Sequence, residues 1–174
     1  MTLANRITIL RILLIPVFII MLLEGRYPWP VLIFSFTIIT DALDGFIARW
    51  RKQTTPLGAF LDPMADKLLM FSSYLLCSYL KIIPVWVFVV ILSRDLLVVL
   101  GWAIIYFITG SKEVKPRPLG KLTTILQMFT MWVILLGVLP HALVEAILYL
   151  TILLTYLSGF DYIYVGSRKL NHNA

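Results

Sequence analysis

The chain has 174 residues, of which 60% are hydrophobic and 14% charged, and its mean hydropathy is +0.93. Soluble domains are roughly 45–50% apolar, so this composition excludes an ordinary soluble globular protein. The charged residues lie in a few places between long apolar runs, which predicts a polytopic membrane protein. The net charge of +6 would suit nucleic acid or an anionic surface. The hydropathy favours membrane lipid as the partner and no nucleic acid.

Six apolar runs are long enough to be membrane helices. We place them at Ile7–Leu23, Trp29–Arg49, Met64–Leu80, Val85–Ile108, Leu122–Leu139 and Ala142–Val165. Glu24, Gly25 and Arg26 follow the first run in place of a small-residue cleavage site, so we interpret that run as a membrane helix and not as a signal peptide. We expect one all-α membrane domain over residues 1–174, with six transmembrane helices and only short loops.

The cations predict the orientation of this domain. With six spans both termini lie on one side, and Arg26 and Lys81 are the two cations on the other side, with Arg94 inside a span. The remaining twelve Lys and Arg residues share the side of the termini. The positive-inside rule therefore predicts cytoplasmic termini in the inner membrane of a multi-pass protein.

The single cysteine, Cys77, lies in an apolar run without a second cysteine to pair with. This excludes an intramolecular disulfide and indicates no thiolate metal cluster. We expect Cys77 to be a small buried apolar residue. The two histidines, His141 and His172, have no clustered partners and are interpreted as non-catalytic.

Four of the nine acidic residues lie in one stretch of 26 residues, at the end of the second run and the start of the third: Asp41, Asp44, Asp62 and Asp66. A charged side chain at mid-membrane costs roughly 2.5–3.5 kcal/mol on insertion scales. Since this cost applies to each of the four acids, we expect them to share a compensating positive charge.

The spacing of these acids indicates a metal site. On helices, residues three or four apart project from one face, so each pair of acids would share a face and two facing helices would bring four carboxylates together. Oxygen ligands without Cys or His suit Mg²⁺ or Mn²⁺. Four carboxylates could hold two ions about 4 Å apart, as in two-metal phosphoryl-transfer sites.

The neighbouring residues favour a phosphate ligand. Gly45 and Ala48 leave space beside Asp44, Arg49 supplies a cation with a planar donor fork, and Gly58 permits close backbone approach. Small residues are also common at helix–helix contacts, so packing is an alternative for Gly45 and Ala48. A cation transporter would explain the acids but not these neighbours, and binding of CDP or CMP would discriminate between the two functions.

This stretch resembles the signature of the CDP-alcohol phosphatidyltransferases, which are integral membrane enzymes with six helices. All eight fixed positions match: Asp41, Asp44, Gly45, Ala48, Arg49, Gly58, Asp62 and Asp66. The resemblance implies that the four aspartates bind two divalent cations, Mg²⁺ or Mn²⁺, and that Asp66 acts as general base. It also implies that the other four residues contact the cytidine diphosphate of the donor.

Residues 4–130 resemble bacterial phosphatidylglycerophosphate synthases, which transfer a phosphatidyl group from CDP-diacylglycerol to glycerol 3-phosphate. The similarity includes an opening segment with Asn5, Thr8 and Arg11, and a later segment that begins at Gly120 and Lys121. It implies that Asn5 and Thr8 contact the CDP group, and it allows a homodimer.

An anionic acceptor would need cations, and we expect Arg94, Arg117 and Lys121 to bind it. The segment Ser93-Arg94-Asp95 departs from the synthase pattern and resembles cardiolipin synthases of the same family, whose acceptor is phosphatidylglycerol. A structural Arg–Asp pair is the alternative for Arg94 and Asp95. The expected enzyme is therefore all-α, with a polar cavity open to the cytoplasm.

Overall fold

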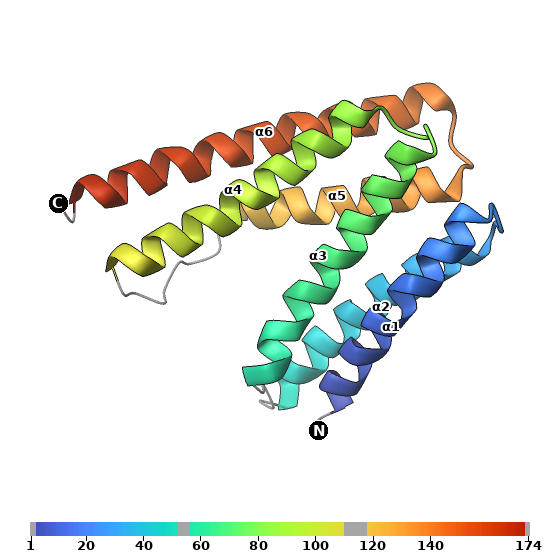
Figure 1. Ribbon diagram of the computed structural model, residues 1–174, viewed down its shortest axis with the longest axis horizontal. Helices are drawn as coiled ribbons and strands as arrows, with labels where there is room; N and C mark the ends of the chain where they lie inside the picture. Colours follow the sequence, from blue (N-terminus) through green and yellow to red (C-terminus); the bar gives the residue numbers. More distant parts are fainter. Residues whose placement is uncertain (1–2, 52–55, 110–117, 173–174) are drawn as a thin grey trace. The chain divides into compact units, whose positions relative to one another are not determined.

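The computed structural model describes the backbone of residues 3–51, 56–109 and 118–172, and the side chains of residues 7–41, 61–101 and 118–162. Within these ranges the chain is all-α and has no strand, which confirms the predicted class. The helices are α1 (Leu3–Leu23), α2 (Trp29–Arg51), α3 (Pro56–Tyr79), α4 (Val85–Thr109), α5 (Pro118–Leu136) and α6 (His141–His172) (Figure 1). They form two compact units, Met1–Ile82 and Ile83–Ala174, and each is described by itself.

Left-handed residues end three of the helices. Gly25 after α1 and Gly137 after α5 have φ values of 65° and 63°, and Lys81 after α3 has a φ of 60°. Backbone N–H groups of these turns donate to carbonyls of the last helical turn, as in Schellman and related caps. The fifth helix was predicted to reach Leu139 but ends at Leu136, because the conformation of Gly137 stops the helix.

Two helices, α3 and α6, extend furthest beyond their predicted apolar runs. The third begins at Pro56 and not at Met64, since proline is well suited to the first turn of a helix and Pro63 is accommodated inside it. The sixth continues to His172, beyond the predicted Val165, because a helix does not have to end where its apolar residues end.

In the first unit, α1 packs against both α2 and α3. Phe18 of α1 and Phe34 of α2 are fully buried, with ring centroids 6.1 Å apart. Cys77 of α3 is also fully buried, as predicted. Thr8, Arg11 and other polar side chains are buried in the same unit, so its interior is not purely apolar.

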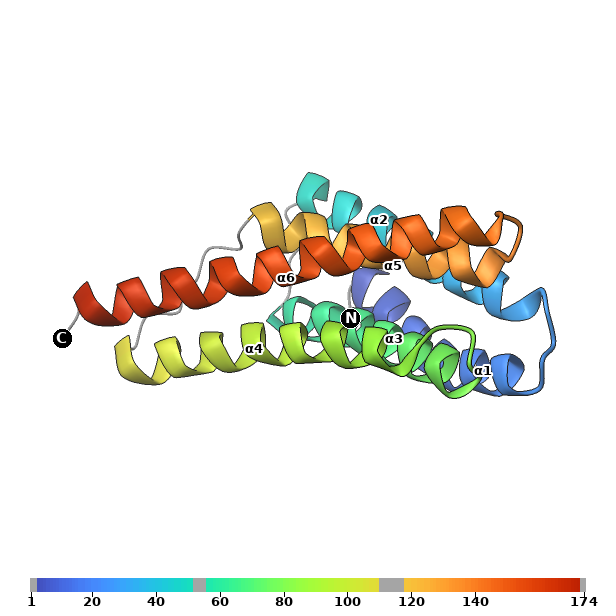
Figure 2. The same ribbon diagram turned by 90° about the horizontal axis from the view of Figure 1, so that it is seen from above.

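In the second unit, α6 packs against both α4 and α5. Figures 1 and 2 show α4 and α6 side by side along much of their length. The buried residues of this unit include apolar side chains such as Met131 and Val87, and a set of polar side chains on facing helices.

Two of the described helical segments, Pro118–Leu136 and His141–Tyr162, are long and apolar enough to cross a membrane. Shorter apolar helices cover Ile7–Leu23 and Trp29–Asp41. Large apolar side chains are widely exposed, whereas Arg11 is only 1% exposed. Helices that place polar groups inside and apolar groups outside are suited to lipid, which supports a membrane protein.

Candidate active site

Three helices of the first unit meet at the side chain of Arg11. Its Nη1 atom lies 2.8 Å from Oδ1 of Asp41 on α2 and 2.7 Å from Oδ1 of Asp66 on α3. Arg11 itself is on α1 and is 1% exposed, while the two carboxylates are partly accessible. One guanidinium nitrogen therefore bridges acids that are 25 residues apart in the chain.

A second contact lies one helical turn before Arg11. The hydroxyl of Thr8 donates a hydrogen bond to Oδ1 of Asp62. Thr8 and Arg11 are three residues apart on α1, and Asp62 and Asp66 are four apart on α3, so both pairs have the spacing of one helix face. Helix α1 thus supplies one partner to each of these acids, and the fold brings Asp41, Asp62 and Asp66 to the same face of α1.

Other predicted site residues lie on parts of the helices where the structure does not describe the side chains. Asp44 follows Asp41 by three residues on α2, as the helical spacing predicts, but its side chain lies outside the described residues. The same holds for five more residues predicted to contact the donor: Asn5 on α1, Gly45, Ala48 and Arg49 on α2, and Gly58 on α3. Arg117, predicted to bind the acceptor, lies outside the described residues altogether.

The chemistry of the gathered donors suits a hard divalent ion. Carboxylate oxygens of Asp41, Asp62 and Asp66 are the ligand type that Mg²⁺ and Mn²⁺ prefer. In the part of the chain with described side chains, no three ligating groups form a ready-made metal cluster. The position between Asp41 and Asp66 is instead taken by the Arg11 guanidinium, so this position already accommodates a cation.

The comparison with known families agrees with this donor set. The model of the family described as CDP-alcohol phosphatidyltransferase matches residues 1–157. The chain belongs to this family. Members catalyse phosphatidyl transfer, so the protein is an enzyme of phospholipid biosynthesis, and the family membership does not support a cation transporter.

Relatives of this phosphatidyltransferase carry two kinds of name. A Bacillus subtilis protein named CDP-diacylglycerol–glycerol-3-phosphate 3-phosphatidyltransferase is 33% identical, over 92% of each chain. A Mycobacterium tuberculosis protein named "Probable phosphatidylglycerophosphate synthase" is 36% identical, over 97% of this chain and 83% of its own. A Drosophila melanogaster protein named "Probable cardiolipin synthase (CMP-forming)" is 31% identical over 94% of this chain. This chain spans only 57% of the length of the Drosophila protein.

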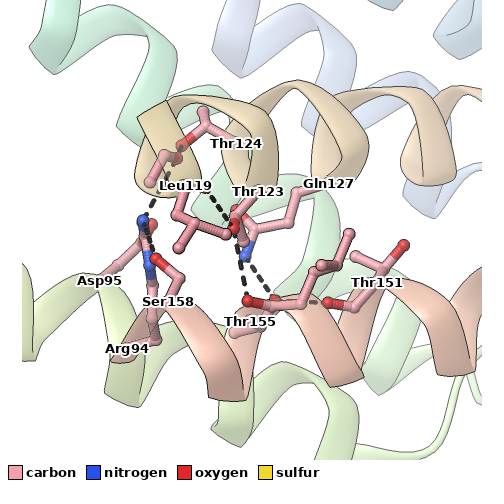
Figure 3. A network of polar contacts seen from close by, with 11 residues as sticks. Arg94, Asp95, Leu119, Thr123, Thr124, Gln127, Thr151, Thr155 and Ser158 are labelled. Carbon is pink, nitrogen blue, oxygen red and sulfur yellow. Dashed lines mark hydrogen bonds and ion pairs between the residues drawn. The ribbon is translucent and has the colours of Figure 1, made fainter. Parts of the chain in front are cut away.

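The second unit of the phosphatidyltransferase contains a buried arginine, Arg94 on α4. Its Nη1 atom lies 2.9 Å from Oδ1 of Asp95, and its Nη2 atom donates to Oγ of Ser158 at 2.9 Å and to the carbonyl of Gly120 at 3.3 Å (Figure 3). The guanidinium also lies over the ring of Tyr162, 5.8 Å from its centroid. Arg94 therefore joins α4, α5 and α6.

Gly120 makes this arrangement possible. A Cβ atom at this position would lie 3.1 Å from both Nη2 of Arg94 and the Tyr162 ring, which is tighter than ordinary van der Waals contact. Lys121 follows immediately and is exposed. Of the cations predicted to bind the acceptor, Arg94 and Lys121 are thus placed at the same end of α5.

A pocket of about 350 Å³ lies beside Arg94 between α4 and α6. Its walls are mostly apolar, including Val89, Leu97 and Phe160, and Ser93 and Thr155 contribute polar groups. The pocket is lined by residues of α4 and α6, and none of the predicted acidic ligands is among its lining residues. It is not the polar cavity predicted around those acids.

A line of polar side chains continues from Arg94 along α5 and α6. Gln127 donates to Thr155 at 3.2 Å (Figure 3). The hydroxyls of Thr130 and Thr151 lie 2.6 Å apart. These residues are all buried. We call Thr123, Gln127, Thr130, Thr151, Thr155 and Ser158 the polar seam.

We expect the polar seam to stabilise the second unit. The double variant Thr130→Val and Thr151→Val should show a coupling free energy of about 0.6 kcal/mol, and no more than about 2 kcal/mol, since interhelical hydrogen bonds in membranes have this strength. The measurement is unfolding of the full chain in detergent, as a double-mutant cycle. Thr124→Val is the matched control, because the Thr124 hydroxyl donates to Gly120 within α5. Strictly additive losses for the Thr130 and Thr151 variants would contradict this role.

Two features of the site were not predicted. Arg11 was counted as a cation that sets the orientation and as part of the opening segment, without a contact partner, although a charge inside an apolar run already indicated a buried partner. The polar seam was missed as well, although its members recur at i, i+4 and i+7 on both α5 and α6, the spacing of one helix face.

Proposed function

We propose that the enzyme transfers the phosphatidyl group of CDP-diacylglycerol to glycerol 3-phosphate and releases phosphatidylglycerophosphate and CMP. The observation that carries this proposal is the meeting of Asp41, Asp62 and Asp66 on one face of α1. The full-length similarity to bacterial relatives that bear this name supports the choice of acceptor.

We further propose that Asp41, Asp44, Asp62 and Asp66 hold two divalent cations, Mg²⁺ or Mn²⁺. When bound, such ions would neutralise the donor diphosphate and stabilise the charge that develops during transfer. The contacts of three of these acids with Arg11 and Thr8 support this role, because they bring carboxylates of α2 and α3 to the same face of α1.

In the proposed reaction, Asp66 accepts the proton of the 1-hydroxyl of glycerol 3-phosphate. The oxygen of that hydroxyl forms a bond to the β-phosphorus, and the bond from this phosphorus to the CMP oxygen breaks. A carboxylate is a weak base near pH 7, so its position relative to the hydroxyl must provide much of the effect. Arg11 donates a hydrogen bond to Oδ1 of Asp66, and this contact helps to orient the carboxylate.

Two further groups of residues are proposed to bind the substrates. Asn5, Thr8, Gly45, Ala48, Arg49 and Gly58 would contact the CDP group of the donor. Arg94, Arg117 and Lys121 would bind the phosphate of the acceptor. The exposure of Lys121, next to the end of α5 where Arg94 is anchored, supports its access to a soluble ligand.

The proposed arrangement in the cell follows from the acyl chains of the donor, which must remain in lipid. We propose six membrane spans in the inner membrane, with both termini and the active site on the cytoplasmic side, and the family resemblance allows a homodimer. The excess of cations on that side supports this orientation.

Product analysis tests the acceptor directly. Labelled CDP-diacylglycerol is supplied to the purified enzyme with glycerol 3-phosphate, phosphatidylglycerol, serine or inositol phosphate. We expect phosphatidylglycerophosphate. The Ser93-Arg94-Asp95 segment and the Drosophila relative favour cardiolipin synthesis as the second candidate. Cardiolipin formed from phosphatidylglycerol, without any turnover of glycerol 3-phosphate, would establish that second function instead.

We expect Lys121→Gln to raise the KM for glycerol 3-phosphate much more than the KM for CDP-diacylglycerol. A lost charge-assisted hydrogen bond corresponds to roughly 1.5–3 kcal/mol, or about ten- to hundredfold. Steady-state kinetics with each substrate varied in turn provide the measurement. Lys81→Gln is the control, because Lys81 is an exposed cation in the turn after α3. Equal changes in both KM values would show that Lys121 does not bind the acceptor specifically.

A further inference from the structure

Arg11 is a charged side chain in an apolar helix, and it is fully enclosed. Its exposed fraction is 1%, and its Nη1 atom contacts both Asp41 and Asp66. A buried charge is stable only when it is paired and hydrogen-bonded. The two carboxylates are partly exposed, at 36% and 26%, and they supply the negative charge that compensates Arg11.

We propose that Arg11 is a positioning residue that serves as the site's own counter-cation. It holds Asp41 and Asp66 in place while no divalent ion is bound, and it competes with such ions for the same carboxylates. The second half of this inference rests on the proposed function, because it requires that the acids bind divalent cations.

The geometry explains why an arginine on α1 can do this. Asp41 and Asp66 lie on different helices, and Nη1 of Arg11 can bridge them because this nitrogen carries two N–H donors. Thr8 holds Asp62 one turn away, so α1 restrains acids at two levels of the site. Contacts with α1 therefore restrain all three of these carboxylates.

The consequence is a reciprocal coupling between Arg11 and the ions. A fixed positive charge beside the carboxylates opposes the binding of a further cation. Removing that charge should destabilise the ion-free protein, because two acids lose their partner, and should also tighten ion binding. An arginine with a purely structural role would produce the first effect without the second.

The experiment compares three variants of the full chain in detergent with the wild type. Arg11→Met removes the charge and keeps a long side chain, and Arg11→Lys keeps the charge without the planar fork. Arg26→Met is the matched control, since Arg26 and Glu24 form an exposed pair at 2.6 Å in the same unit. Thermal unfolding is recorded in EDTA and then across a titration of MnCl₂.

We expect Arg11→Met to lower the Tm in EDTA by several degrees and Arg26→Met to leave it unchanged. Mn²⁺ should raise the Tm of Arg11→Met more than that of the wild type. The Mn²⁺ concentration that gives half of this rise should be lower by about tenfold for Arg11→Met than for the wild type. Arg11→Lys should keep the wild-type response to Mn²⁺ and show a smaller loss in EDTA.

An unchanged Tm for Arg11→Met in EDTA would overturn the proposal. If Mn²⁺ raises the Tm of the wild type but raises that of Arg11→Met by the same amount or not at all, the proposal is also overturned. An Arg11→Met protein that stays unfolded in saturating Mn²⁺ would overturn it as well. Failure of the proposed function has a different signature, which is a wild-type Tm that Mn²⁺ does not change.

Discussion

Asp62→Asn is expected to lose both the metal-dependent binding of CDP-diacylglycerol and turnover, whereas Asp66→Asn should keep binding and lose turnover. The difference arises because Asp62 is proposed as a central ligand and Asp66 as the group that accepts the proton. Loss of a general base reduces the rate by about 10²- to 10⁴-fold. Binding of labelled CDP-diacylglycerol, with and without Mg²⁺, is measured beside the initial rate.

Two controls make this comparison specific. Glu145→Gln removes an exposed carboxylate on α6, which faces His141 at 3.5 Å, and should change neither binding nor rate. Unfolding in Mg²⁺ shows whether each variant remains folded, since Asp62 and Asp66 also hold Thr8 and Arg11. Equal losses of binding in both variants would contradict the separate roles of Asp62 and Asp66, although such a result would still agree with a metal site.

Chelation is expected to abolish activity, and Mg²⁺ or Mn²⁺ should restore it. The proposed ligands are all carboxylates, which bind these hard cations and release them to an excess of EDTA. The ion-free protein should stay folded, because Arg11 remains in contact with Asp41 and Asp66. Activity is measured after dialysis against EDTA and again after each metal is added back.

A thiol reagent provides the complementary control. Cys77 is fully buried on α3, and a thiolate has no part in the proposed ligand set. Treatment with a maleimide under native conditions should therefore leave the rate unchanged. Full activity in excess chelator would refute the two-metal proposal, and inactivation by the maleimide would contradict the carboxylate assignment.

The class of the fold and the composition of the acidic motif could be read from local patterns. Each apolar run carries enough residues for a membrane helix, and this information is contained in neighbouring positions. Asp41 and Asp44, three apart, and Asp62 and Asp66, four apart, do lie on α2 and α3. Helix ends were harder to predict, because Gly137 and Pro56 set them through backbone conformation and not through hydropathy.

The sequence by itself thus determined the six helices, the family and the acids proposed to carry the chemistry. Only the tertiary structure decided which charged and polar side chains contact one another. Arg11 reaches Asp41 and Asp66 across separations of 30 and 55 residues, and Arg94 reaches Ser158 across 64. A helical repeat of 3.6 residues says which side chains share a face, but it does not say which other helix that face will meet. The choice of partner depends on packing between distant segments, which exists only in the folded chain.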